Sequence, residues 1–175
     1  MQTPVHNEPG MKEMKGNRFA PPNAAAMMEA LRGLGYSTAT ALADVIDNSL
    51  AAGATEVHIR FEWHGINSRV SILDNGVGMT DPELEAAMTL GSRNPRDKRA
   101  ASDLGRFGLG LKTPSFSQCR KLTVASRKKG GMLACLRWDL DAIERDPKGG
   151  WNLLEGVEPE AASTLSLLDE HTSGT

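Results

Sequence analysis

The chain of 175 residues is long enough for one domain with a hydrophobic core and too short for two such domains. Its hydrophobic fraction of 39% and charged fraction of 24% are typical of an ordinary soluble protein, and no apolar run reaches the length of a signal peptide or a membrane helix. Cys119 and Cys135 form no C-x-x-C pair, which favours a reduced, cytoplasmic protein. The histidines have no metal-ligand spacing.

The net charge of −2 hides an uneven distribution along the chain. The segment from Arg93 to Lys129 holds eleven lysines and arginines against two acids, Asp97 and Asp103, and so carries a net charge of +9. Both flanking segments are acidic. A basic segment inside an acidic protein indicates an anionic ligand, although a solvated basic face is the alternative.

Residues 1–22 are rich in Met, Asn, Pro and Gly without periodicity and predict a flexible N-terminal arm before a domain over residues 23–175. Ser37 or Thr38 is a suitable cap for a helix that runs to about Ala52 and ends at Gly53. Its apolar positions three and four residues apart predict the buried face: Ala39, Leu42, Ala43, Ile46 and Leu50. A second face carries the polar positions Asp44, Asp47 and Asn48, beside Ala51.

Two strands follow, from Val57 to Glu62 and from Arg69 to Leu73, with alternate apolar residues predicted to point inward. These inward residues are Val57, Ile59, Phe61, Val70 and Ile72. The spacing of Thr80 and Glu83 predicts a capping box for a helix through about Leu90.

Residues 91–106 predict a polar, basic, mobile loop. A short helix is expected next, and it must begin near Lys112 or Thr113 because Pro114 fits only a first turn. A hairpin then joins Leu122–Ser126 to Met132–Trp138. This order predicts an α/β fold, a two-layer sandwich of a mixed, mostly antiparallel sheet with helices on one face.

Three motifs carry candidate chemistry, and each alone has an ordinary structural explanation. The polar stripe at Asp44, Asp47 and Asn48 resembles a solvent-facing helix surface. The "DNGVG" stretch that starts at Asp74 is a common turn, because Asn-Gly tolerates positive φ. The glycines of "GRFGLGLK", residues 105–112, offer free amides for a phosphate, but glycine-rich turns are frequent.

Together, in this order and at these separations, the three motifs resemble the GHKL ATPases: gyrase B subunits, heat-shock chaperones of the ninety-kilodalton class, histidine kinases and MutL. The stretch "DNSLAAGATEVHI" is most similar to MutL-type mismatch-repair proteins, and "GRFGLGLKT" to the Microrchidia ATPases. The resemblance spans about Tyr36 to Arg127, with a further piece at Gly174-Thr175.

The resemblance implies an ATP site with Mg²⁺. It assigns Asn48 as the metal ligand, Asp44 as the base that activates water, and Asp74 as the acceptor for the adenine amino group. Lys112 is expected to add positive charge at the phosphates, and residues 91–106 to form the ATP lid. The remaining nucleotide-binding candidates are Asp47, Gly76, Gly78, Met79, Gly105, Arg106, Phe107, Gly108, Leu109, Gly110 and Thr175.

One departure from the family pattern concerns Asp44, where the family usually has glutamate. A carboxylate one methylene shorter misplaces the water by about 1 Å, a change that costs about 10²-fold in rate. A slow ATPase and a nucleotide-binding switch without turnover both stay open, as does a base role for Asp47. The kinase branch of the family needs a phosphoacceptor histidine helix, which the sequence lacks.

In this family a Gly-Thr pair opens a sheet strand, and its threonine lies at the adenine-binding aspartate or at a bound water. If Gly174-Thr175 is that pair, the domain is expected to continue into a transducer domain. A stray "SGT" in a polar tail is the alternative. The resemblance also suggests a homodimer through the N-terminal arm and, by analogy alone, DNA as a partner.

Overall fold

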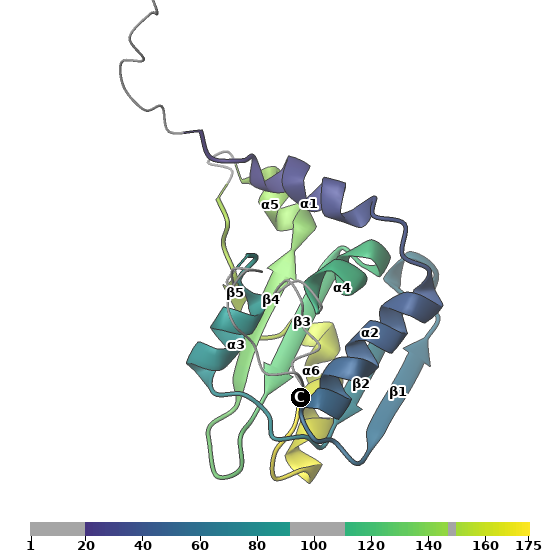
Figure 1. The fold of residues 1–175 in the computed structure, drawn as a ribbon, viewed down its shortest axis with the longest axis vertical. Coiled ribbons are helices and arrows are strands. Elements are labelled where there is room, and N and C mark those ends of the chain that lie inside the picture. The colour runs from purple at the N-terminus through teal and green to yellow at the C-terminus, as the bar shows by residue number, and fades with distance from the viewer. Residues whose placement is uncertain (1–19, 92–110, 147–149) are drawn as a thin grey trace, which may run out of the picture.

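The computed structural model describes residues 20–91, 111–146 and 150–175, without the side chain of Glu160. In chain order, pairs of helices alternate with antiparallel pairs of strands, and short elements follow (Figure 1). They are α1 (Ala24–Arg32), α2 (Thr38–Ala51), β1 (Val57–Glu62), η1 (Gly65–Asn67), β2 (Arg69–Asp74), α3 (Asp81–Met88), α4 (Lys112–Gln118), β3 (Lys121–Ser126), β4 (Ala134–Asp139), α5 (Leu140–Arg145), β5 (Leu154–Glu155), η2 (Pro159–Ala161), α6 (Ala162–Leu165) and η3 (Ser166–Glu170).

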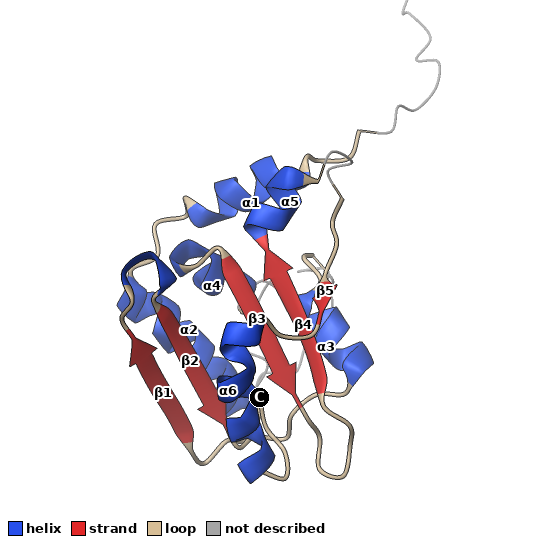
Figure 2. Cartoon of the chain, turned by 180° about the vertical axis from the view of Figure 1, so that it is seen from behind, coloured by secondary structure: helices blue, strands red, loops and turns tan. Residues whose placement is uncertain are grey.

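The described strands form two antiparallel sheets, one of β1 and β2 and one in the order β3-β4-β5. The first hairpin pairs Val57 with Asp74, and the second pairs Lys121 with Asp139. Strands β2 and β3 run in the same direction (Figure 2). At their carboxyl ends Gly174 pairs with Arg127, so the end of the described chain lies between the two sheets.

Helices α1 to α4 cover one face of the sheets, and the short helices after η2 lie against the opposite face (Figures 1 and 2). The predicted fold class is therefore confirmed, with antiparallel sheets and a principal helical layer. The C-terminal helices, which were not predicted, add a smaller cover on the other side.

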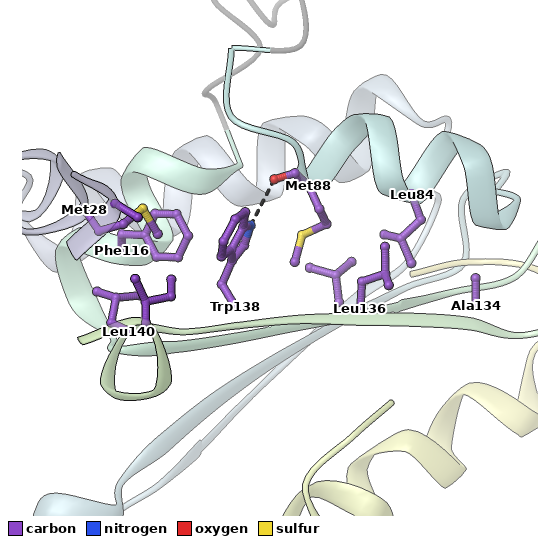
Figure 3. Close-up of a cluster of buried hydrophobic side chains, with 11 residues drawn as sticks. Met28, Leu84, Met88, Phe116, Ala134, Leu136, Trp138 and Leu140 are labelled. Atoms are coloured by element: carbon purple, nitrogen blue, oxygen red, sulfur yellow. Dashed lines mark hydrogen bonds between the residues drawn. The ribbon is translucent and has the colours of Figure 1, made fainter. Parts of the chain in front are cut away.

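The hydrophobic core lies between β4 and helices α1, α3 and α4 (Figure 3). Alternate residues of β4 point toward these helices because side chains of a strand alternate between its faces: Ala134, Leu136 and Trp138. The indole Nε1 of Trp138 also donates a hydrogen bond to the Met88 carbonyl, at 2.9 Å. Full burial of each large apolar side chain contributes about 1.5–3 kcal/mol.

The boundaries predicted for α2 are confirmed, but its predicted buried face is only partly correct, because Leu42 and Ile46 are half-buried and the other predicted residues are exposed. The Ser37 hydroxyl caps the helix by accepting from the Thr40 amide at 3.1 Å, and Gly53 follows the helix end with φ 72°. The buried residues are Ala41 and Ser49, whereas Leu50 is 57% exposed. Ser49 bonds directly to Asp74 at the end of β2, and α2 packs mainly on α4, so the buried side of α2 is not the one that carries the most apolar residues. Two further residues of the predicted face, Ala39 and Ala43, are exposed.

The first hairpin forms as predicted, but its apolar residues are less buried than expected. Ile59 is 37% exposed, Phe61 44% and Val70 46%. Both strands are edges of this two-stranded sheet, and β1 also lies outside the part that α2 covers (Figure 1). A strand with alternating apolar residues is therefore half-buried only where a helix lies over it.

The capping box, the start of α4 and the second hairpin are also confirmed. The Glu83 carboxylate accepts from the amide of Thr80 at 2.8 Å, and its ion pair with Lys128, together with the Thr80 bonds, lowers the pKa of Glu83 to about 2. Helix α4 begins at Lys112, which places Pro114 in its first turn. The second strand of the later hairpin begins at Ala134 rather than at Met132.

Helices α1 and α5 were not predicted, and Arg120 joins them. Its guanidinium bonds to Asp141 at 2.6 Å and Glu144 at 2.8 Å on α5, and also to Glu29 on α1. These bonds raise the pKa of Arg120, and the bond from Arg120 lowers the pKa of Asp141. The cluster fastens the two helices at one end of the core.

Candidate functional site

The polar stripe of α2 holds two of its side chains in defined positions. The amide nitrogen of Asn48 donates to the main-chain oxygen of Asp44 at 3.0 Å, which leaves the Asn48 carbonyl oxygen available as a ligand. The Tyr36 hydroxyl donates to the Asp44 carboxylate, and burial followed by the charge of Asp44 raises the pKa of Tyr36. Asp44 and Asn48 are half-buried, whereas Asp47 is exposed.

Asp74 ends strand β2 as a buried carboxylate, only 6% exposed. Its Oδ2 accepts from the Ser49 hydroxyl of α2 at 2.9 Å, and its Oδ1 accepts from the amide of Gly76 at 2.9 Å. A buried carboxylate needs such donors, and each of its oxygens retains capacity for another hydrogen bond. The side chain is thus fixed and still able to accept.

The turn after Asp74 is fastened to the connection between α2 and β1. The side-chain oxygen of Asn75 accepts from the amides of Thr55 at 2.9 Å and Glu56 at 3.0 Å. Gly76 lies against the end of α2, where an added Cβ would come within 2.9 Å of the Ala52 carbonyl oxygen. A side chain at this position would push the turn away from α2.

Gly78 is the tightest position of the site. Its φ of 64° favours glycine, and a Cβ placed there would lie 2.0 Å from the Arg127 carbonyl oxygen. The next amide, of Met79, donates to the Ser126 hydroxyl at 2.8 Å. The main chain at Gly78 and Met79 therefore lies directly on the end of β3.

Thr175 lies at the same place. Its main-chain oxygen accepts from the amide of Asp74 at 2.9 Å, and its hydroxyl is 2.7 Å from the Ser126 hydroxyl. The structure thus brings Asp74, Gly78 and Thr175 together, although they are far apart in the sequence. They line one end of an open hollow of about 1850 Å³ between the two sheets, which Asn48 also lines. The hollow is larger than one nucleotide requires, so its volume does not identify a ligand.

Lys112 lies away from this group. Its side chain is buried, and its ammonium donates to the carbonyls of Ala87 and Thr89, both at 2.7 Å. The positive charge therefore lies at the carboxyl end of α3, where helix carbonyls favour a cation. Its expected contact with phosphates stays a prediction.

Other predicted site residues lie outside the described part of the chain. They are Gly105, Arg106, Phe107, Gly108, Leu109 and Gly110, together with all of the predicted lid beyond Gly91.

Several residues of the site were missed by sequence reasoning. Ser49 and Ser126 are buried hydroxyls that orient Asp74, Met79 and Thr175. For Ser49 a signal existed, since it directly follows Asn48 in the "DNSLAAGATEVHI" stretch. Asn75 lies inside the predicted "DNGVG" turn but was interpreted only as a turn residue, and Tyr36 gave no comparable signal.

These features agree with the comparison to known proteins. Residues 36–175 match the family model described as histidine kinase-, DNA gyrase B- and HSP90-like ATPase, and the chain belongs to this family. Family membership supports ATP binding by the domain.

Similar curated proteins include two named DNA mismatch repair protein MutL. The one from Rickettsia akari is 32% identical over 93 residues, 53% of this chain and 15% of that protein. The one from Colwellia psychrerythraea is 32% identical over 135 residues, 75% and 19% respectively. ATPase morc-1 of Caenorhabditis elegans is 31% identical over 97 residues, 55% of this chain and 11% of that protein. The chain thus spans less than a fifth of each of these relatives.

Two features are absent from the described residues. No helix in residues 20–91, 111–146 or 150–175 is long and apolar enough to cross a membrane. Within the same ranges, no group of three or more His, Cys, Asp or Glu residues is arranged to hold a metal ion.

Proposed function

We propose that the chain binds Mg²⁺-ATP at the site between α2 and the turn after β2, and hydrolyses it slowly. The observation that carries the proposal is the buried carboxylate of Asp74, which Ser49 and Gly76 orient at 2.9 Å each. It stands beside main chain that approaches its neighbours too closely for any side chain, at Gly76 and Gly78. This packing fixes the turn beside a carboxylate that can still accept a hydrogen bond, which suits a base that carries an amino group.

At this end of the site, the Asp74 carboxylate accepts a hydrogen bond from the adenine amino group. Guanine presents a carbonyl oxygen at the equivalent position and would meet the carboxylate acceptor to acceptor. Sites built to hydrogen-bond one group discriminate strongly against an analogue without it. The proposal therefore includes selectivity for adenine over guanine.

At the other end, Asn48 is the proposed metal ligand. Its amide nitrogen is used within the helix by the Asp44 main-chain oxygen, and its remaining oxygen is the ligand type that Mg²⁺ prefers. Bound Mg²⁺ would neutralise charge on the phosphates. One protein ligand is compatible with a cation that keeps several waters.

Asp44 is the proposed general base for the attacking water. Tyr36 donates to its carboxylate and so restricts its orientation. Its short side chain supports a low rate rather than a high one, because water placement by about 1 Å changes rates by about 10²-fold.

A nucleotide-binding switch without turnover is the second candidate, and the same feature of Asp44 favours it. The two candidates share the binding site and differ only in whether phosphate is released. By analogy with the family, the first proposal extends to a lid at residues 91–106 that closes over the nucleotide. Its closure would drive a conformational or dimerisation cycle, with the N-terminal arm at the dimer contact and DNA as a partner.

Calorimetry of the 175-residue chain tests the proposal. ATP and a non-hydrolysable analogue are titrated with and without Mg²⁺, and phosphate release is followed in parallel. Saturable binding of both nucleotides that tightens with Mg²⁺ is expected. Binding without phosphate release favours the switch, and no binding of either nucleotide contradicts the proposal.

A further inference from the structure

Arg127, at the end of β3, joins the candidate site to the C-terminal helices. One nitrogen of its guanidinium, Nη2, donates to the Leu168 carbonyl at 2.6 Å and to the His171 carbonyl at 3.3 Å. The same nitrogen lies 3.3 Å from the Asp169 carboxylate. The side chain thereby holds the end of η3 against the sheet.

The main chain of the same residue supports the turn of the candidate site. The Arg127 amide and carbonyl form a pair of 3.0 Å hydrogen bonds with Gly174. Its carbonyl oxygen is the atom that an added Cβ on Gly78 would strike, at 2.0 Å. Gly174 leads into Thr175, whose main-chain oxygen accepts from the Asp74 amide.

Arg127 thus connects residues 168–171, through its side chain, to Gly174 and the turn at Gly78, through its main chain. Residues 168–171 lie only a few positions before Gly174, so the guanidinium and the Arg127 main chain hold two ends of one short segment. Release of residues 168–171 leaves Gly174 and Thr175 attached by their main-chain bonds and by the Ser126 hydroxyl, which lies 2.9 Å from the Gly174 carbonyl oxygen and 2.7 Å from the Thr175 hydroxyl. Those bonds in turn fix the amide of Asp74 and the floor under Gly78.

We propose that Arg127 is a positioning residue for the nucleotide site, which holds residues 168–175 in place and thereby fixes the turn that contains Asp74 and Gly78. This role rests on the proposed function, because it acts at the end of the site assigned to the base. By thermodynamic linkage, a ligand that requires the fixed turn also stabilises residues 168–175.

The test compares three variants. Arg127→Met removes the donors and keeps most of the apolar stem. Arg127→Lys retains a donor, and because all three side-chain contacts come from one nitrogen, a single ammonium is able to replace it. Arg120→Met is the matched control, since Arg120 also joins distant elements but lies at the α1–α5 end of the core.

Two readouts apply to each variant: amide hydrogen exchange at Asp74 and Gly174 without nucleotide, and calorimetric affinity for adenosine and for ATP. In Arg127→Met, exchange at both amides is expected to rise about tenfold, and affinity for adenosine and ATP to fall by a common factor of about ten. Arg127→Lys is expected to recover most of both losses. Arg120→Met is expected to lower the melting temperature and leave the affinities unchanged.

The proposal would be overturned if Arg127→Met kept the amide exchange rates and the adenosine affinity of wild type. It would also be overturned if Arg120→Met lost as much nucleotide affinity and amide protection as Arg127→Met. If Arg127→Met does not fold, hydrogen exchange of the wild-type protein is compared with and without saturating adenosine. Adenosine is then expected to slow exchange at the His171 and Gly174 amides. Unchanged exchange at both amides contradicts the role of Arg127. If wild type binds neither adenosine nor ATP, the proposed function fails, while exchange at Asp74 in the variants still tests the contact path.

Discussion

The two ends of the candidate site differ in how much of their geometry the fold supplies. At the Asp74 end, a buried carboxylate has two donors, and Gly76 and Gly78 lie against neighbouring main chain. At the Asn48 end, the side chains are half-buried or exposed, and Asn48 and Asp44 each have a single neighbouring partner on α2 or in the segment before it. The Asp74 end therefore consists of buried groups that also hold the fold together, whereas the Asn48 end consists of partly exposed side chains on α2.

This difference predicts that substitutions at the two ends affect different properties of the protein. Substitutions at the Asp74 end are expected to change both the free energy of unfolding and nucleotide affinity, because the same contacts serve both. Substitutions at the Asn48 end are expected to change metal binding or turnover and leave stability within about 0.5 kcal/mol of wild type. Substitutions at either end of the site test this expectation.

The largest effect is expected at Asp44. Asp44→Ala should retain ATP binding and lose about 10²- to 10⁴-fold in turnover, because a general base acts mainly on the transition state. Asp44→Glu should match or exceed the native rate. Phosphate release under saturating ATP measures both. A native rate in Asp44→Ala would transfer the base role to Asp47.

At the other end, Gly78→Ala should destabilise the fold by about 3–5 kcal/mol, since the added Cβ meets the Arg127 carbonyl oxygen at 2.0 Å. Gly130→Ala is the matched control: Gly130 has φ 73° and no atom within 4 Å of an added Cβ, so only the backbone strain of about 1 kcal/mol remains. Urea unfolding of both variants gives the comparison. Equal losses would show that the close approach at Gly78 is unimportant.

Ser49→Ala should lower the free energy of unfolding by about 1.5–3 kcal/mol, because the buried Asp74 carboxylate loses a donor. ATP affinity should fall with it, and thermal unfolding with and without ATP measures both effects. A stable Ser49→Ala protein with weakened ATP binding would separate the two properties that this end is expected to couple.

The smallest effect is expected for Asn48→Ala, in which Mg²⁺-linked ATP affinity should fall about tenfold, or about 1.4 kcal/mol, while affinity without Mg²⁺ changes less. Stability should stay near wild type. Titrations of ATP with Mg²⁺ and with a chelator provide the measurement. An equal fall under both conditions would mean that Asn48 does not ligate the metal.

Sequence reasoning succeeded where the determinants are local. The Ser37 cap, the capping box at Thr80 and Glu83, and the turn after Asp74 depend on residues a few positions apart, and the structure contains all of them. It failed for the orientation of α2, because apolar residues occupy several sides of that helix and only its tertiary contacts, with α4 and with Asp74, select one. Exposure of β1 likewise depends on how far α2 extends over the sheet.

The same limit applies to the candidate site. Family motifs located the positions of Asp74 and Gly78, but not the residues that support them. Ser49 is 25 positions from Asp74, and Arg127 is 41 positions from Leu168, so neither pairing follows from local spacing. The roles of Asn48, Asp44 and Lys112 toward a nucleotide are still predictions.

The central claim, an adenine-binding site organised around Asp74, is tested most directly by calorimetric titration of wild type and Asp74→Asn with ATP and GTP. Melting curves verify that both proteins are folded. Wild type is expected to bind ATP and not GTP, and Asp74→Asn to lose ATP affinity because the amide group presents a donor where the carboxylate accepts. Unchanged ATP affinity in a folded Asp74→Asn protein would contradict the account.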